Sequence, residues 1–273
     1  MSETHWSRMA RLWQLVGPPL RPAPEDLAAF QDAVDLWPET HGRTPRALIL
    51  GVTPELYALR WPPGTSLHAL DASQQMIDTV WPGSPTAALR GSWTAMPLAT
   101  GSCDIVVCDG GLGMLSYPHG QAELLRELHR ILVPGGIFVV RLFAPKGRTG
   151  TVEEVFANLD AGNIASLDAL KMLLWGALHG DAHEGVRPRE VVARILAAVG
   201  SFDRLAEDHG WPLEHVRSLE LHRESTAVYH LTDAGEVVRM AMYDPGGFET
   251  VGVVEPGHAL GACCPIVTLR RSD

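Results

Sequence analysis

Two residues in the first third of the chain have the types and the spacing of a nucleoside-binding site. Gly51 follows one apolar run, and Asp71 ends a second apolar run twenty residues later. Glycine lets a ligand approach the backbone after a strand, and a helix that begins at Pro54 would point its N-terminus at that ligand. A carboxylate at the end of the next strand can accept hydrogen bonds from both hydroxyls of a ribose. The spacing therefore predicts a nucleoside site built on Gly51 and Asp71.

The turn that contains Gly51 does not fit a dinucleotide. The fingerprint Gly-x-Gly-x-x-Gly needs further glycines at two positions where Thr53 and Leu56 stand. A pyrophosphate therefore has little room against this backbone. S-adenosylmethionine (SAM) carries no phosphate and tolerates a less open loop, so the sequence favours SAM over NAD as the ligand.

Two further side chains could serve the same site. Arg21 lies in the proline-rich sequence PPLRP and could bind the SAM carboxylate, or an anion of the substrate, through two hydrogen bonds. A solvated arginine in a turn is the alternative. His119 follows the apolar run that ends at Asp109, at the end of the sheet where a base would be needed. A histidine in a surface loop is the alternative for His119.

A metal site is not expected. His179 and His183 have the four-residue spacing that can bind zinc on a helix. Gly180 lies between them just past a predicted helix end, so the pair falls in a loop, and the sequence offers no third ligand.

The elements that position these residues belong to an α/β protein. Short apolar runs bounded by turn residues predict five strands, at 46–51, 66–71, 87–90, 103–109 and 136–143. The segment 121–132 between the last two has one apolar stripe and is a predicted helix. Apolar strands that alternate with helices indicate a parallel sheet covered on both faces. Two more strands near the end of the chain, at 248–254 and 263–271, would close the sheet as an antiparallel edge hairpin.

The expected fold is thus a Rossmann-like sheet of seven mostly parallel strands with a C-terminal edge hairpin and a helical cap. Outside the sheet we predict helices at 5–16, 25–36, 166–180 and 187–200. The helix that follows Ser166 is apolar over a wider arc than one packing face needs, so we expect the helices of 166–200 to form part of a substrate wall. The predicted parts are an N-terminal helical lid, a SAM-binding core, a helical substrate cap and the final strands, at 1–40, 41–150, 151–242 and 243–273.

Composition excludes several classes of protein. The net charge is −10 and no Lys/Arg-rich run occurs, so nucleic acid is a poor candidate for a partner. The chain has no secretory h-region at its N-terminus and no apolar stretch of about 18 residues, so we expect a cytoplasmic protein without a membrane span. The four cysteines form no metal-binding or redox motif and are expected to be reduced: Cys103, Cys108, Cys263 and Cys264.

Four segments together resemble the class I SAM-dependent methyltransferases. The sequence ALILGVTPEL stands at the glycine-rich first motif of that family, and LDASQQMI is similar to its acidic second motif. RGSWTAMPLATGSCDIVVCDG is similar to the loop after the third strand and to the fourth strand. LHRILVPGGIFVVRLF is close to the family's helix, Pro-Gly-Gly turn and fifth strand, and it is the most specific of the four. The resemblance covers about 46–143 and the last two strands.

The resemblance implies a role for each residue of the site. Gly51 would contact the methionine end of SAM and Asp71 the ribose, while Ala72, Ser92 and Trp93 would contact the adenine. Asp109 and Gly110 would lie at the rim beside the sulfonium, where a carboxylate is electrostatically favourable. The expected cofactor-binding set is Arg21, Gly51, Thr53, Asp71, Ala72, Met76, Ser92, Trp93, Asp109 and Gly110, and the candidate catalytic residues are Asp109 and His119.

The expected activity is SAM-dependent methyl transfer to a small molecule, with the acceptor left open. The first motif departs from the family, which usually has at least two glycines there, because Thr53 and Glu55 take their places. That departure supports one alternative, an inactive methyltransferase-like scaffold or partner subunit. An NAD-linked oxidoreductase is a weaker alternative. The motif Asn-Pro-Pro-Tyr, which serves methylation of base nitrogens, is replaced by Asp109-Gly110-Gly111-Leu112.

Overall fold

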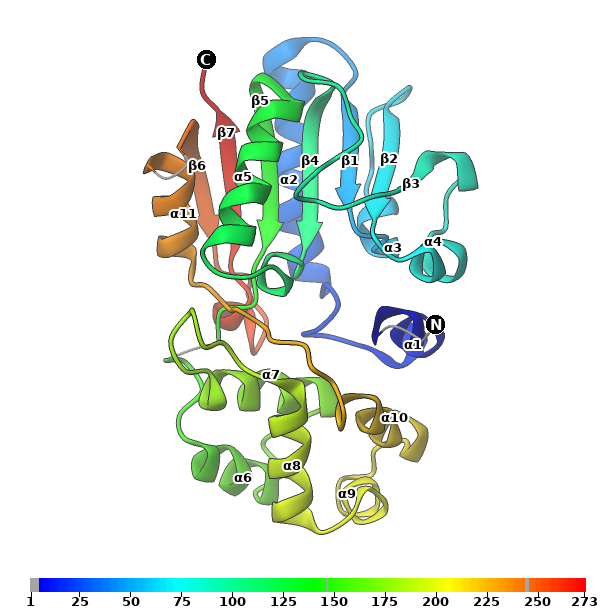
Figure 1. Ribbon diagram of the computed structural model, residues 1–273, viewed down its shortest axis with the longest axis vertical. Helices are drawn as coiled ribbons and strands as arrows, with labels where there is room; N and C mark the ends of the chain where they lie inside the picture. Colours follow the sequence, from blue (N-terminus) through cyan, green and yellow to red (C-terminus); the bar gives the residue numbers. More distant parts are fainter. Residues whose placement is uncertain (1–4, 146, 244–245) are drawn as a thin grey trace.

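The computed structural model describes residues 5–145, 147–243 and 246–273. One mixed sheet occupies one half of the molecule, and a group of helices lies beyond the carboxyl ends of its strands (Figure 1). The seven strands have the order β3-β2-β1-β4-β5-β7-β6, with β7 antiparallel to both neighbours. Their bounds are Arg46–Leu50 (β1), Ser66–Asp71 (β2), Ala88–Arg90 (β3), Cys103–Asp109 (β4), Leu132–Arg141 (β5), Phe248–Val254 (β6) and Ile266–Arg271 (β7). The predicted Rossmann-like fold with its edge hairpin is confirmed.

The register of the sheet brings the predicted site residues to one edge. Leu50, the last residue of β1, is paired with Leu70 of β2 and with Cys108 of β4. The next residues along these three strands are Gly51, Asp71 and Asp109. Because parallel strands end at the same edge, those three residues lie side by side where open α/β sheets bind ligands.

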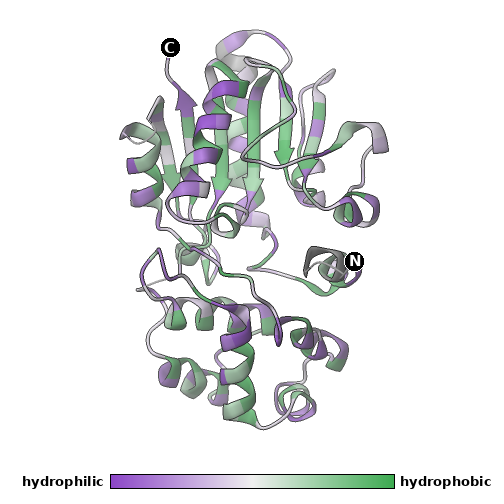
Figure 2. Cartoon of the chain, in the orientation of Figure 1, coloured by the Kyte–Doolittle hydropathy of each residue, from purple (hydrophilic) through white to green (hydrophobic). Residues whose placement is uncertain are grey.

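Both faces of the sheet are covered by helices, because successive residues of the central strands point to opposite faces. Leu48 and Leu50 pack with α5 (His119–Ile131) and α11 (Ala234–Tyr243). Ala47 and Ile49 pack on the other face with α2 (Pro24–His41), α3 (Pro54–Tyr57) and α4 (Gln74–Val80). The central strands are therefore largely apolar between their ends (Figure 2).

The helices beyond the strand ends have a hydrophobic core of their own. Capping residues start three of them: Thr151 forms a capping box, and Ser166 and Ser201 each accept a hydrogen bond from the first turn. This group is called the cap below, and it comprises α6 (Val152–Asp160), α7 (Leu167–Leu178), α8 (Pro188–Val199), α9 (Phe202–His209) and α10 (Leu213–Arg217). Helix α1 (His5–Leu12) lies between α4 and the cap (Figure 1).

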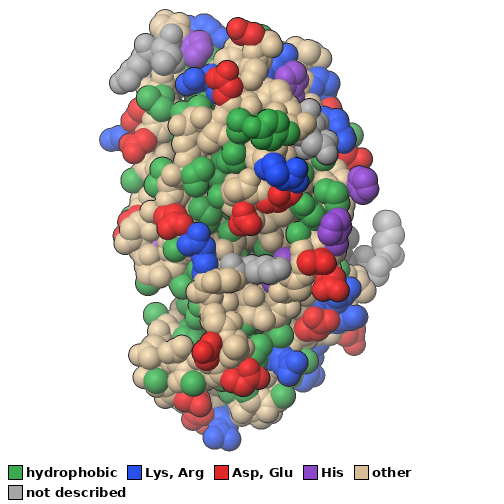
Figure 3. All heavy atoms as spheres, turned by 90° about the vertical axis from the view of Figure 1, so that its left-hand side faces the viewer, with side chains coloured by type: hydrophobic (Ala, Val, Ile, Leu, Met, Phe, Trp, Pro, Cys, Tyr) green, Lys and Arg blue, Asp and Glu red, His purple; other side chains and the backbone are tan. Residues whose placement is uncertain are grey.

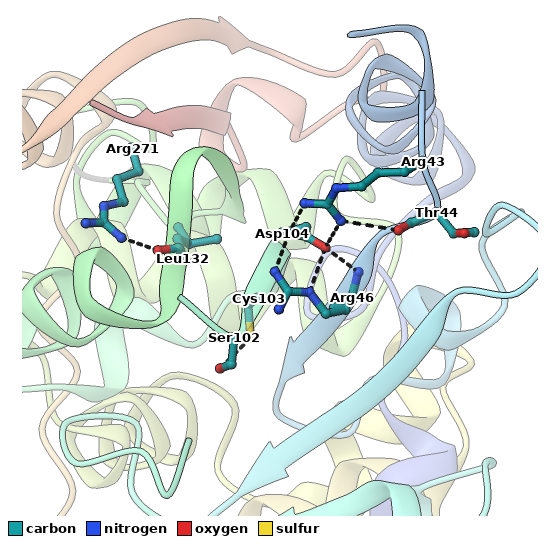
Figure 4. Close-up of polar contacts among 8 residues, drawn as sticks. All are labelled: Arg43, Thr44, Arg46, Ser102, Cys103, Asp104, Leu132 and Arg271. Carbon is teal, nitrogen blue, oxygen red and sulfur yellow. Dashed lines mark hydrogen bonds and ion pairs between the residues drawn. The ribbon is translucent and has the colours of Figure 1, made fainter. Parts of the chain in front are cut away.

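A buried ion cluster fixes the edge of the sheet that is remote from the strand carboxyl ends. The fully buried Asp104 accepts hydrogen bonds from the guanidinium groups of Arg43 and Arg46 at 2.8–3.0 Å, and from the backbone N–H of Arg46 (Figure 4). Burial opposes the charge of Asp104, but these donors hold the pKa of the carboxyl well below its usual range. The cluster ties the start of β1 to the start of β4.

Several predicted element bounds need correction. The predicted helix 5–16 is split, because a 3-10 turn, Trp13–Leu15, follows α1. Helix α2 extends to His41, and β5 already begins at Leu132, so the Pro-Gly-Gly turn forms an irregular part of that strand. Pro265 separates the last two cysteines from β7, which begins at Ile266. All four cysteines are buried and free, as predicted.

The division into four parts stays a prediction. Its first part includes residues 1–4, which lie outside the described residues. Helix α11, the last in the predicted segment 151–242, packs against β6 and β7 rather than on the cap. The side of the molecule that carries α11 and β6 shows hydrophobic side chains among charged ones (Figure 3), and Tyr243, Val253 and Val254 are among the exposed residues there. Within the described residues, no helix is long and apolar enough to cross a membrane.

Candidate active site

A cavity of about 300 Å³ lies at the carboxyl edge of the sheet, between the sheet and the cap. Most of the residues predicted to bind the cofactor line it: Gly51, Thr53, Asp71, Ala72, Met76, Ser92, Trp93, Asp109 and Gly110. They come from the turns after β1, β2, β3 and β4, which the sheet register brings together. The cavity is mainly apolar with a few polar groups, as is usual for small-molecule sites.

Gly51 forms the turn at the end of β1 and has to be glycine. Its φ of +91° lies in a region that other residues rarely adopt. Its N–H donates to the Leu70 carbonyl oxygen at 2.8 Å, which holds the turn against the end of β2. The predicted helix start is confirmed, because α3 begins at Pro54 with Thr53 as its N-cap. Thr53 is buried and lines the cavity.

Asp71 ends β2 and presents its carboxylate to the cavity. Oδ1 accepts a hydrogen bond from the Ser73 N–H at 2.7 Å. Oδ2 has no hydrogen-bond partner among the residues that the structure describes. Burial raises the pKa of Asp71 to about 6, and the Ser73 hydrogen bond opposes that rise. A half-buried carboxylate with one oxygen still available suits a donor such as a ribose hydroxyl.

The start of α4 fixes the residues next to Asp71. Ser73 is the N-cap of this helix and its Oγ accepts from the Met76 N–H at 3.3 Å, so Met76 is turned into the cavity wall. Ala72 lies between Asp71 and Ser73 in the chain and also lines the cavity. Its carbonyl oxygen accepts a hydrogen bond from Arg90 Nε at 3.4 Å.

Trp93 covers the ends of the central strands. Its indole Nε1 donates to the Leu70 carbonyl oxygen at 2.8 Å. A Cβ atom at Gly111 would come within 2.6 Å of the ring, so only glycine at that position leaves room for Trp93. Ser92 precedes it, also in the cavity wall, with its Oγ 3.0 Å from Thr94 Oγ1. The sequence singled out Trp93 but not the glycine on which its placement depends.

Asp109 belongs to a buried ion network at the end of β4. Its Oδ1 accepts a hydrogen bond from Arg141 Nε at 2.5 Å. The Arg141 Nη1 donates to the Pro19 carbonyl oxygen at 2.9 Å and to Asp26 Oδ2 at 3.2 Å. Burial disfavours the charge on Arg141, but the two carboxylates outweigh it and raise the pKa of the guanidinium. Asp109 therefore joins β4, β5 and the segment before α2.

A comparison with protein families assigns the domain that forms this site. The family described as "Methyltransferase domain" matches residues 50–140, the stretch that contains Gly51, Asp71, Trp93 and Asp109. Residues 50–140 therefore match a methyltransferase domain. No curated protein matches the chain in sequence.

Solved structures share the methyltransferase fold over nearly the whole chain. A Rhodobacter sphaeroides protein, provisionally named a Zn-dependent alcohol dehydrogenase, has a TM-score of 0.63 and 15% identity, with 98% of this chain and 97% of that chain covered. The CcbJ methyltransferase from Streptomyces caelestis has a TM-score of 0.58 and 15% identity, covering 99% and 98%. The N-methyltransferase NodS from Bradyrhizobium japonicum, in complex with S-adenosyl-L-homocysteine (SAH), has a TM-score of 0.50 and 11% identity. That alignment covers 98% of this chain and 99% of NodS. Identities this low establish the fold alone.

Arg21 is not among the residues that line the cavity. Its Nε donates to Glu55 Oε1 at 2.7 Å, and its guanidinium lies over the ring of Trp13 at 5.6 Å. The carboxylate that Arg21 binds is thus one of the protein's own. Glu55, which stands where the family usually has a glycine, ties the proline-rich segment to the turn after β1.

His119 also lies apart from the cavity. It is the first residue of α5, and its side chain is exposed to solvent. A 3-10 turn, Leu112–Met114, carries the chain away from Asp109 before α5 begins. Met114 and Leu115 line the cavity instead, so the geometry does not favour His119 as a base.

Residues that the sequence did not single out complete the methyltransferase cavity. They are Met9, Trp13, Val16 and Leu20 of the N-terminal segment, Lys171 and Trp175 of the cap, and His222 and Tyr229 of the segment that follows the cap. The wide apolar arc of α7 was a usable signal, because Lys171 and Trp175 of this helix line the cavity. No described residue of α8 lines it, and the role of the wall in substrate binding stays a prediction. The remaining residues carry no local signal, because only tertiary packing brings them to the strand ends.

The histidine pair in the loop after α7 is used elsewhere. His179 Nε2 accepts a hydrogen bond from the Leu231 N–H at 3.1 Å. The ring of His183 packs edge-on against Tyr117, with centroids 5.0 Å apart. Among the described residues there is no group of three or more His, Cys, Asp or Glu side chains that could hold a metal ion.

Proposed function

We propose that this chain is a SAM-dependent methyltransferase that transfers a methyl group to a small-molecule acceptor. The observation that supports it most is the convergence of the Gly51 turn and the Asp71 carboxylate in one cavity of a methyltransferase domain. SAM supplies a methyl group that its sulfonium already activates, so positioning accounts for much of the acceleration.

The proposed roles follow from the cavity wall. Asp71 accepts the ribose hydroxyls through its available oxygen, and the Gly51 turn with Thr53 receives the methionine end. The adenine lies against the wall formed by Ala72, Met76, Ser92 and Trp93. The Arg21 to Glu55 ion pair holds the N-terminal segment over this wall.

Asp109 and Gly110 form the rim where the methyl group is transferred. The charge of Asp109 is balanced by Arg141, and its Oδ1 is occupied, so it contributes position and local polarity rather than acting as a strong base. The Gly110 φ of +64°, and a Phe143 ring only 2.5 Å from a Cβ built there, leave no room for a side chain at the rim. A dedicated base is not required of this set of residues.

Cofactor choice provides the test. SAM and SAH should raise the melting temperature of the purified chain, because a ligand that binds only the native state stabilises it. NAD should not, since the turn at Gly51 lacks the further glycines that a pyrophosphate needs.

Thermal unfolding at increasing ligand concentrations measures this preference, with AMP as the control for simple adenine binding. An equal shift with NAD would favour an oxidoreductase. No shift with SAM or SAH would favour a scaffold without cofactor.

A further inference from the structure

The cap places a lysine and an aromatic wall next to each other on the cavity. Lys171 and Trp175 are four residues apart on α7, so they lie on one face of the helix, and both line the cavity. Trp175 contacts Tyr229 edge-on, with ring centroids 5.2 Å apart, and Phe143 at 6.0 Å. These three aromatic residues line the cavity together, Trp175 and Tyr229 from segments beyond the strand ends and Phe143 from just after the end of β5.

Lys171 is nearly buried, with a side chain only 6% exposed. Its ammonium donates to Asp168 Oδ1 at 3.0 Å. Among the residues that the structure describes, no other acceptor is within hydrogen-bond distance of Nζ, so two of its three N–H donors are left. It is also the one Lys or Arg among the described residues that line the cavity.

Asp168 does not depend on Lys171 alone. Its Oδ2 accepts from the Gly17 N–H at 2.7 Å and lies 3.3 Å from His215 Nε2. Burial works against the charge of Asp168, yet Lys171, His215 and Gly17 together keep its pKa below the usual value. If Lys171 also binds a second anion, the Asp168 carboxylate is still stabilised by the Gly17 N–H and by His215.

We infer that Lys171 and Trp175 form the acceptor subsite, and that the acceptor is a small planar molecule with an anionic group, such as an aromatic carboxylate. The planar body packs on Trp175, and the anionic group accepts charge-assisted hydrogen bonds from the available Lys171 donors. This assignment rests on the proposed methyltransferase function.

Matched acid and amide probes test the inference on the full-length chain saturated with SAH. The pairs are benzoate and benzamide, 4-hydroxybenzoate and 4-hydroxybenzamide, and indole-3-acetate and indole-3-acetamide, each measured by calorimetry. At least one acid should bind ten times more tightly than its amide. Lys171→Met should reduce that preference to within twofold, and Lys171→Arg should retain it. Trp175→Leu should weaken the acid and the amide alike, because it removes the shared packing surface.

Two controls keep the outcomes apart. Arg148→Met removes an exposed cation that pairs with Glu255 outside the cavity, and it should change no affinity. Lys171→Met alone leaves the Asp168 carboxylate buried without its lysine, which could unfold the protein. The double variant Asp168→Asn/Lys171→Met removes both charges, so it should remain folded in that case.

Each other outcome overturns a definite statement. No acid preference in any pair, or a preference that survives Lys171→Met, overturns the acceptor subsite. A loss of SAH binding in Lys171→Met would assign this lysine to the carboxylate of the cofactor instead. Failure of the parent chain to bind SAH would reject the proposed function, and the acceptor subsite with it.

Discussion

The Asp71 carboxylate combines two properties that usually oppose each other in a folded protein. It is sufficiently buried for its pKa to rise to about 6, and among the described residues its carboxylate accepts a single hydrogen bond, from the Ser73 N–H. A carboxylate in that environment costs folding free energy when it is ionised. Its place beside the Gly51 turn explains why the cost would be tolerated, because the available oxygen can bind a ribose.

Removal of the Asp71 carboxylate should weaken binding of SAM and SAH by at least about tenfold. Charge-assisted hydrogen bonds are each worth about 1.5–3 kcal/mol, and about 1.4 kcal/mol corresponds to that factor. Asp71→Asn should lose less than Asp71→Ala, since its amide oxygen still accepts one hydrogen bond. Calorimetric titration gives the affinities, and circular dichroism verifies folding. Parent-like affinity in a folded Asp71→Ala variant would refute the ribose assignment.

The affinity for SAH should also depend on pH through Asp71. The carboxylate forms as the pH rises through about 6, so the dissociation constant should fall between pH 5 and pH 7 and then level off. The folding stability of the unliganded protein changes in the opposite direction. Because the pKa of Asp71 is raised in the folded state, its contribution to stability is lost as the pH rises from about 4 to about 6.

Asp71→Asn isolates this effect, because it changes no other ionisable side chain. The variant should lack the Asp71 part of the pH profile and should melt at a higher temperature than the parent at pH 8 without ligand. Identical pH profiles for the two proteins would show that Asp71 does not titrate in this range.

At the scale of elements, one arginine holds three segments together. Arg141 at the end of β5 pairs with Asp109 of β4 and with Asp26 of α2, and it donates to the Pro19 carbonyl oxygen. Its Nη2 has no hydrogen-bond partner within the described residues, and the guanidinium lies over the Phe143 ring at 5.3 Å. The proline-rich segment is thereby fixed at the carboxyl edge of the sheet, next to the cavity.

Loss of Arg141 should destabilise the whole protein. Arg141→Met leaves two buried carboxylates without their cation, and removal of one partner of a buried ion pair costs about 3–5 kcal/mol. Arg60→Met is the matched control, because its ion pair with Asp35 is exposed and worth about 1 kcal/mol at most. Urea unfolding followed by circular dichroism gives both values. A loss for Arg141→Met no larger than that of Arg60→Met would mean that the network does not fix these segments.

At the scale of the whole molecule, the cavity lies between two separately packed parts. The sheet with its covering helices has cores on both faces, and the cap has a core of its own. Residues of both parts line the cavity, and the Gly17 N–H of the N-terminal segment donates to Asp168 of the cap. A ligand that touches both walls would therefore stabilise their relative position as well as each wall.

The sequence by itself determined the sheet and the nucleoside half of the site. Apolar strands, glycine turns and the spacing from Gly51 to Asp71 are local patterns, and parallel strands bring their ends together without further information. Trp93 and Met76 were assigned through the resemblance to the methyltransferase motifs, and both line the cavity.

Only the tertiary structure decided the other half. Arg21 could bind an anion by its chemistry, yet its Nε donates to Glu55 Oε1 at 2.7 Å and its charge is balanced there. No local sequence pattern reveals that pairing. Lys171 looks like an ordinary helix lysine in the sequence, and it becomes a cavity residue because the cap folds back over the strand ends. The spacing within a strand or helix is fixed by backbone geometry, whereas contacts between segments far apart in the chain depend on how the cores pack.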